Sequence, residues 1–68
     1  MRDPKRIDDF CEELKKMWQQ VPDWRYGQLI VNALGEIQTK EKRDVFFIED
    51  DKMLEELKEL FATKFKVY

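Results

Sequence analysis

Apolar residues between positions 7 and 18 recur at the spacing of one face of an α-helix. Steps of three and four residues place them on one stripe, because an α-helix turns once every 3.6 residues. Asp3 and Pro4 favour a helix start, since the Asp oxygen accepts a free amide hydrogen and Pro has none to leave unpaired. Pro22 disfavours helical geometry at Val21. We therefore expect a helix over residues 4–20, with an apolar stripe formed by Ile7, Phe10, Cys11, Leu14, Met17 and Trp18.

A second helix is predicted over residues 23–34, with Asp23 as its cap and Gly35 as a left-handed stop. Its apolar residues cover more than half of its circumference, which is typical of the middle helix of a small bundle. We expect Trp18 of the first helix and Ile30 of the second to be core residues. Gly27 costs stability inside a helix, so we interpret it as a position of close approach by another helix or by a partner.

The sequence of the second half of the chain predicts a loop, a short extended segment and a third helix. Residues 35–44 are mostly charged and read as a loop or a frayed helical extension. The run VFFI at 45–48 is too short for a helix and rich in β-branched and aromatic residues, so we expect it to be extended. Three acids at 49–51 favour a helix start, giving a helix over 50–64. Its apolar stripe is Met53, Leu54, Leu57, Leu60, Phe61 and Phe65.

These elements predict an all-α fold, a small three-helix domain with a short extended segment before the third helix. Sixty-eight residues allow a single helical domain, 1–68, near the lower limit for an unaided core. No apolar run approaches the roughly 20 residues needed to cross a bilayer, so no membrane association is expected. A single Cys allows no intramolecular disulfide, and no secretory-type segment opens the sequence. We expect a soluble protein of the reducing cytoplasm.

The residue inventory argues against catalysis. The chain has no His and no Ser, which removes the usual base near neutral pH and the commonest hydroxyl nucleophile. Cys11 lies on the apolar stripe and is interpreted as a small buried hydrophobe. The acids at 49–51 lack the ligand spacing of a calcium loop, and Glu55, Glu56 and Glu59 alternate with lysines as on a solvated face. We therefore expect no catalytic residue, no metal and no cofactor, and predict that the protein is not an enzyme.

One polar stripe of the second helix is a candidate recognition surface. Arg25, Gln28, Asn32 and Glu36 follow at steps of three, four and four residues and so lie on one side of the helix. Gln and Asn both donate and accept hydrogen bonds, and Arg offers a fork of donors. The stripe is interpreted either as a binding surface or as the solvated edge of a central helix.

The motifs RDPKRI at 2–7, PDWRYGQLIVN at 22–32 and FFIEDD at 46–51 resemble those of a family of short uncharacterised proteins from bacteria and their phages. That family carries a Pro-Asp-Leu-Arg-hydrophobic-Gly-Gln-Leu-Ile core and a Phe-Tyr-hydrophobic-Glu-Asp segment. Here Trp24 replaces the usual Leu and Phe47 the usual Tyr. The resemblance implies that the two motifs form one structural joint or one binding site, for instance with Glu49 or Asp50 paired to Arg25. The candidate partner-binding residues are therefore Arg25, Gln28, Asn32, Phe46, Phe47, Glu49 and Asp50.

Two functions follow as hypotheses. The first is a protein-interaction or regulatory module, because a short chain without the usual catalytic residues acts most easily by presenting a surface. The alternative is a small nucleic-acid-binding helical protein that reads base edges with the polar stripe of its second helix. Its charges weigh against this alternative: 13 basic and 15 acidic residues give a net charge of -2, which leaves few phosphate contacts.

Self-association as a two-fold dimer is a further prediction. We do not expect one small core to cover every apolar residue that lies outside the three stripes or at their end. These residues are Phe46, Phe47, Ile48, Phe65, Val67 and Tyr68. One side of the VFFI segment would then cover its own bundle while the other meets a second copy. In the alternative, the segment lies in a groove between the helices of a single chain.

Overall fold

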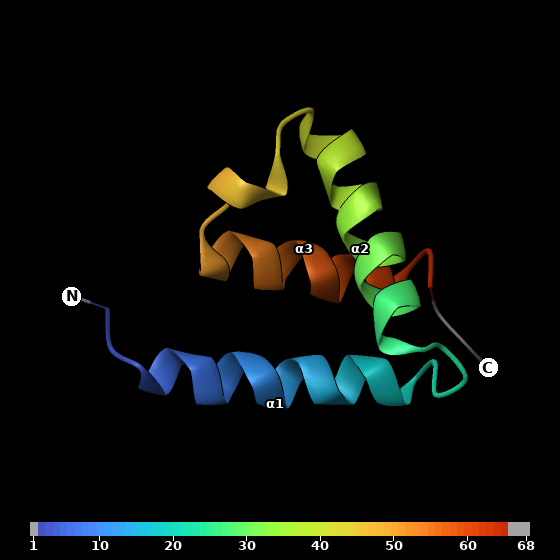
Figure 1. The fold of residues 1–68 in the computed structure, drawn as a ribbon, viewed down its shortest axis with the longest axis horizontal. Helices are drawn as coiled ribbons and strands as arrows, with labels where there is room; N and C mark the ends of the chain where they lie inside the picture. The colour runs from blue at the N-terminus through green and yellow to red at the C-terminus, as the bar shows by residue number, and fades with distance from the viewer. Residues whose placement is uncertain (1, 66–68) are drawn as a thin grey trace.

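A computed structural model describes residues 2–65 and contains three α-helices and one short 3₁₀ turn. The helices are α1 (Lys5–Gln19), α2 (Tyr26–Glu41) and α3 (Asp50–Ala62), and the turn is η1 (Val45–Phe47). Figure 1 shows α2 rising from the C-terminal end of α1, with α1 and α2 both lying against α3. Residues 2–65 contain no strand, so the predicted small all-α domain is confirmed. Val67 and Tyr68 lie outside the described residues.

The start of α1 agrees with the prediction to within one residue. Asp3 Oδ1 accepts a hydrogen bond from the backbone N–H of Lys5 at 2.9 Å. This bond satisfies one of the amides that a helix start leaves without an intrahelical partner. At the other end the chain leaves the helix before Pro22, as the restriction on the residue before Pro requires.

The predicted bounds of α2 were wrong at both ends. The helix begins at Tyr26, and Gln28 Oε1 accepts from the backbone N–H of Arg25 at 2.7 Å, so Asp23 is not its cap. It continues through Gly35 to Glu41, and the left-handed residue that ends it is Lys42, at φ 56°. Burial of Ile37 offsets the cost of an internal glycine, which is about 1 kcal/mol.

Residues 45–47 form a 3₁₀ turn, so of the segment 45–48 that was predicted to be extended only Ile48 has extended backbone angles. Asp44 Oδ1 accepts from the backbone N–H of Phe46 at 2.9 Å and fixes the start of the turn. Three residues per turn place Val45 and Ile48 on the same side, where Val45 is half-buried and Ile48 buried. Phe46 and Phe47 consequently point away from the core.

The core is made by all three helices, the turn before α2 and the end of η1. Its buried members are Met17, Val21, Leu29, Ala33, Ile37, Ile48, Leu57 and Phe61. Trp18 is half-buried against this core, and its ring N–H donates to the carbonyl of Trp24 at 2.9 Å. Ile30 is only half-buried, so the prediction that it is central was wrong; Leu29, the residue before it, has that role.

A further interpretation from the sequence was wrong: Cys11 is exposed, because the apolar stripe of α1 is wider than the surface that α3 covers. Close approach of another helix of the same chain does not explain Gly27, since a Cβ atom there would have no neighbour within 4 Å. Approach by a partner stays a prediction. The same open space surrounds Gly35.

Gly35→Ala should therefore raise the free energy of unfolding by about 0.5–1 kcal/mol, because Ala loses less backbone entropy than Gly in a helix interior. Urea denaturation of both proteins measures the difference. A lower stability of the Ala variant would contradict the open surroundings of this position.

Candidate functional site

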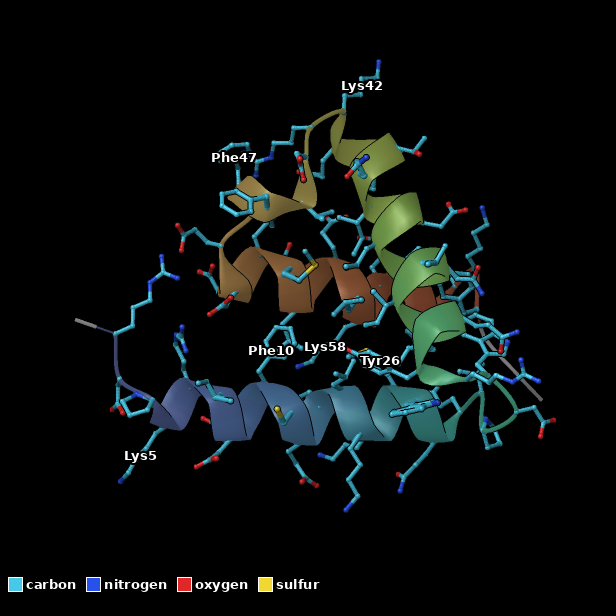
Figure 2. The ribbon with its side chains drawn as sticks, viewed as in Figure 1. Lys5, Phe10, Tyr26, Lys42, Phe47 and Lys58 are labelled. Atoms are coloured by element: carbon cyan, nitrogen blue, oxygen red, sulfur yellow. The ribbon has the colours of Figure 1, made fainter. Side chains whose placement is uncertain are left out.

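The candidate partner-binding residues do not form one site. Arg25, Gln28 and Asn32 belong to the first half of α2, whereas Phe46 and Phe47 follow its far end. Sixteen residues at a rise of 1.5 Å make this helix about 24 Å long. Figure 2 accordingly shows Phe47 and Lys42 near one end of α2 and Tyr26 at the other. The structure thus separates two surfaces that the resemblance had joined.

The polar stripe of α2 is largely exposed, but one of its side chains, Gln28, hydrogen-bonds the backbone at the start of the helix. Arg25, Gln28 and Asn32 line an open hollow of about 500 Å³, together with Gly27 and Val31. The amide oxygen of Gln28 is already engaged by the backbone N–H of Arg25. Exposed Val31 also brings an apolar side chain into the stripe. Recognition by Gln28 would therefore compete with the start of its own helix.

Glu36, the last member of the polar stripe, is bound within the chain. Its Oε1 lies 2.8 Å from Lys64 Nζ. This ion pair joins α2 to the residues after α3, so Glu36 contributes to the fold.

The two aromatic side chains of η1 form an exposed pair, named here the Phe46–Phe47 knob. Phe46 is 82% exposed and Phe47 is 68% exposed, in a protein whose other phenylalanines are at least half-buried. Their ring centroids are 5.0 Å apart at an angle of 76°, which is the edge-to-face arrangement that aromatic quadrupoles favour. Val45 and Ile48 anchor the knob to the core from below. The knob is therefore an exposed apolar surface whose backbone is held in place by the packing of Val45 and Ile48.

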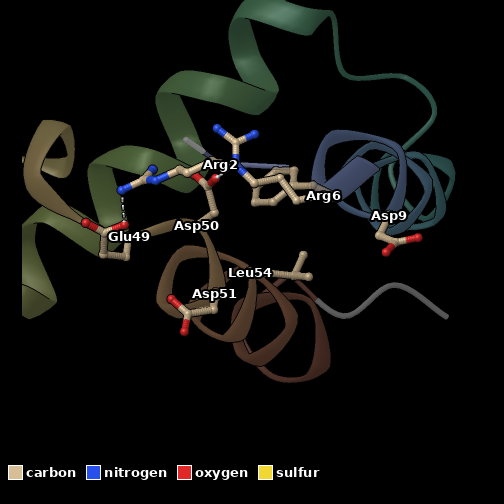
Figure 3. A pocket seen from close by; sticks show the side chains of 8 residues that line it. Arg2, Arg6, Asp9, Glu49, Asp50, Asp51 and Leu54 are labelled. Atoms are coloured by element: carbon tan, nitrogen blue, oxygen red, sulfur yellow. Dashed lines mark hydrogen bonds and ion pairs between the residues drawn. The ribbon is translucent and has the colours of Figure 1, made fainter. Parts of the chain in front are cut away.

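Glu49 and Asp50 pair with the beginning of the chain and not with Arg25, so the pairing implied by the resemblance was wrong. Arg2 binds Glu49, and Arg6 Nε lies 3.2 Å from Asp50 Oδ2. Figure 3 shows both arginines over the start of α3, around a hollow of about 380 Å³. Both pairs are substantially exposed, so they hold Arg2 of the segment before α1 and Arg6 of the first turn of α1 against the start of α3 with little gain in stability.

Sequence reasoning missed the most buried charge among the described residues. Glu56 is 3% exposed, although it was assigned to a solvated face. Lys40 Nζ lies 3.0 Å from one of its carboxylate oxygens and Lys52 Nζ lies 3.2 Å from the other, while Lys40 also reaches Glu59 at 3.2 Å. Two ammonium groups from α2 and α3 therefore close over one carboxylate. The spacing of four from Lys52 to Glu56 was visible in the sequence, but the contribution of Lys40 was not.

The charges of this cluster reinforce one another. The pKa of Glu56 is lowered, chiefly by a hydrogen bond from Lys40. Burial of the carboxylate raises this pKa, and a hydrogen bond from Lys52 lowers it further. Hydrogen bonds to Glu56 and Glu59 raise the pKa of Lys40, and the hydrogen bond to Glu56 raises that of Lys52. All three groups thus stay charged near neutral pH, which suits a clamp between α2 and α3 and not a proton-transfer site.

The described part of the chain carries no metal-site grouping and no membrane-spanning helix. Within residues 2–65, no three His, Cys, Asp or Glu side chains are grouped so that they could hold a metal ion. None of the helices described there is long and apolar enough to span a bilayer. No protein-family model matches the chain, and no match was found among the curated proteins or the solved structures compared with it.

Proposed function

We propose that this chain is a small non-enzymatic interaction module that binds a protein partner through the Phe46–Phe47 knob. The observation that supports this proposal is the exposure of two adjacent phenyl rings on a turn that the core holds in place. Burying a Phe side chain in an interface contributes about 1.5–3 kcal/mol, and exposed aromatic side chains are frequent binding anchors. The absence of His and Ser from the sequence supports a role without catalysis.

Charges beside the knob suggest the chemistry of the partner. Asp44 precedes it, and Glu49, Asp50 and Asp51 follow it. Arg2 and Arg6 neutralise Glu49 and Asp50, whereas Asp51 forms no ion pair within residues 2–65. Lys42 and Arg43 precede Asp44 and are also exposed, so the charges around the knob are mixed. An apolar slot with a polar rim that carries both signs of charge would complement this arrangement.

A photo-crosslinking amino acid in place of Phe47 tests the proposal in the native host. We expect one predominant cross-linked protein, which does not form when the same photo-crosslinker replaces Val31. Val31 is a matched position, because it is also exposed and apolar but lies on α2. Equal products from both positions, or none from position 47, would count against the knob.

The double variant Phe46→Ala, Phe47→Ala separates binding from folding. Both side chains are largely exposed, so the free energy of unfolding should change by no more than about 0.5 kcal/mol for each substitution. Affinity for the captured partner should fall by about a hundredfold, the effect of losing two anchoring side chains. Titration calorimetry measures the affinity. Unchanged affinity would contradict the proposal.

The alternative, nucleic-acid binding by the polar stripe, rests on Arg25, Gln28 and Asn32. Its measurement is the binding of random duplex DNA at low salt. Arg25→Ala should weaken this binding if the alternative holds, whereas the module should show no binding or only weak, salt-sensitive binding.

A further inference from the structure

The apolar stripe of α1 has an outward edge that the core covers only in part. It is named here the α1 outer stripe and consists of Ile7, Cys11, Leu14 and Trp18. Ile7 and Cys11 are exposed, and Leu14 and Trp18 are half-buried. The stripe borders two hollows that meet at Cys11, one of about 210 Å³ beside Ile7 and one of about 440 Å³ beside Leu14 and Trp18. The larger hollow is almost entirely apolar.

The spacing of the α1 outer stripe is the same when read in either direction. Its steps are four, three and four residues, so its centre lies midway between Cys11 and Leu14. A second copy related by a two-fold axis through this centre would place its own α1 antiparallel. Ile7 would then face Trp18 of the second copy, and Cys11 would face Leu14 of the second copy. Steps of three and four residues are those of interlocking helix pairs.

The charges beside the stripe are complementary in the same arrangement. Asp8 and Lys15 lie on the flank of α1 that points away from the core, since each follows a member of the stripe by one residue. Both are exposed, and neither forms an ion pair within the part of the chain that the structure describes. An antiparallel two-fold pair brings like flanks together, so Asp8 meets Lys15 of the second copy twice per dimer. Their levels along the axis differ by two residues, or about 3 Å, which a Lys side chain can span.

We propose that a second copy of this chain docks on the α1 outer stripe, antiparallel and across a two-fold axis between Cys11 and Leu14. A parallel two-fold pair is disfavoured, because it would bring opposite flanks of the two helices together and so separate Asp8 from Lys15 of the second copy. The aromatic contact of Trp18 with the exposed Tyr26, 5.9 Å between ring centroids, extends the apolar surface at each end of the interface. This interface is separate from the Phe46–Phe47 knob and does not depend on the proposed function.

Sedimentation equilibrium with charge swaps tests the proposal. The unmodified chain should show a concentration-dependent dimer. Asp8→Lys and Lys15→Asp should each raise the dimer dissociation constant by about tenfold, because each creates two repulsive pairs. The combined variant should restore the original value, since it exchanges the partners of the same two ion pairs.

Two further variants locate the interface. Cys11→Glu places a charge at the centre of the stripe and should raise the dissociation constant by about a hundredfold or more. Cys11 is exposed in the single chain, so circular dichroism should show the same helix content and a cooperative melt. Phe47→Asp is the matched control and should leave the dimer intact.

Three outcomes would overturn the proposal. The first is a monomer mass at every concentration from about 10 µM to about 1 mM, the range in which weak specific dimers form. The second is a dimer that neither charge swap weakens or that the combined swap fails to restore. The third is a dimer that Phe47→Asp dissociates and Cys11→Glu does not, which would place the interface on η1.

Discussion

Leu29→Ala should lower the free energy of unfolding by about 2–5 kcal/mol, because it leaves a cavity that the surrounding helices can close only in part. Leu29 is 1% exposed and lies among core residues from all three helices. A loss of this size is a large share of the roughly 5 kcal/mol expected for so small a domain. Urea denaturation monitored by Trp fluorescence measures it.

Ile30→Ala is the matched control for this substitution. It removes the same number of carbon atoms from the next residue, which is only half-buried. We expect a clearly smaller loss of stability than for Leu29→Ala. Equal losses, or a larger loss at Ile30, would show that α2 is rotated relative to its described orientation.

Acid should destabilise the protein through the buried carboxylate of Glu56. Its pKa is lower in the folded chain than the ordinary value of 4.5, so its ion pairs stabilise the fold above that pH. This contribution is lost as the pH falls through the folded-state pKa. Glu56→Gln should therefore reduce the melting temperature at pH 7 and flatten its decline below about pH 4.5, because the amide has no proton to gain. Calorimetry between pH 2 and pH 7 provides the comparison.

Glu59→Gln is the control for the acid experiment, since Glu59 is exposed and pairs only with Lys40 within residues 2–65. Its acid profile should follow that of the unmodified protein. Identical profiles for all three proteins would mean that Glu56 does not carry acid-dependent stability. Lys40 and Lys52 affect stability at high pH. Their pKa values in the folded chain are raised above the ordinary value of 10.5, so their ion pairs stabilise the fold below pH 10.5. This contribution is lost as the pH rises through the folded-state pKa values.

Local sequence patterns predicted the three helices because apolar spacing and caps act within a few residues. They failed where a distant segment decides the outcome. Gly35 was interpreted as a stop, although Leu29, Ala33 and Ile37 continue at steps of four; the burial of Ile37 was needed to show that the helix goes on. The assignment of Glu56 to a solvated face failed for the same reason, since Lys40 comes from another helix.

The candidate surfaces were predictable only in outline. An apolar VFFI segment predicted one side against the bundle, and the 3₁₀ geometry determines that this side is Val45 and Ile48. Arg2 and Arg6 received no role, because their acidic partners are more than forty residues away. A stripe of six apolar residues on α1 likewise does not reveal which edge the neighbouring helix covers.

The dependence of α1 and α2 on α3 has a consequence for synthesis. The ribosome releases α1 first, but the helix against which it packs is completed only at Ala62. At roughly 5–20 residues per second, the nascent chain waits roughly 2–9 seconds between the end of α1 and the end of α3. A single 15-residue helix is marginal in water without a packing partner. The apolar stripe of the newly made α1 therefore lacks its packing partner during this interval. A ribosome-associated chaperone can bind the stripe until α3 packs against it.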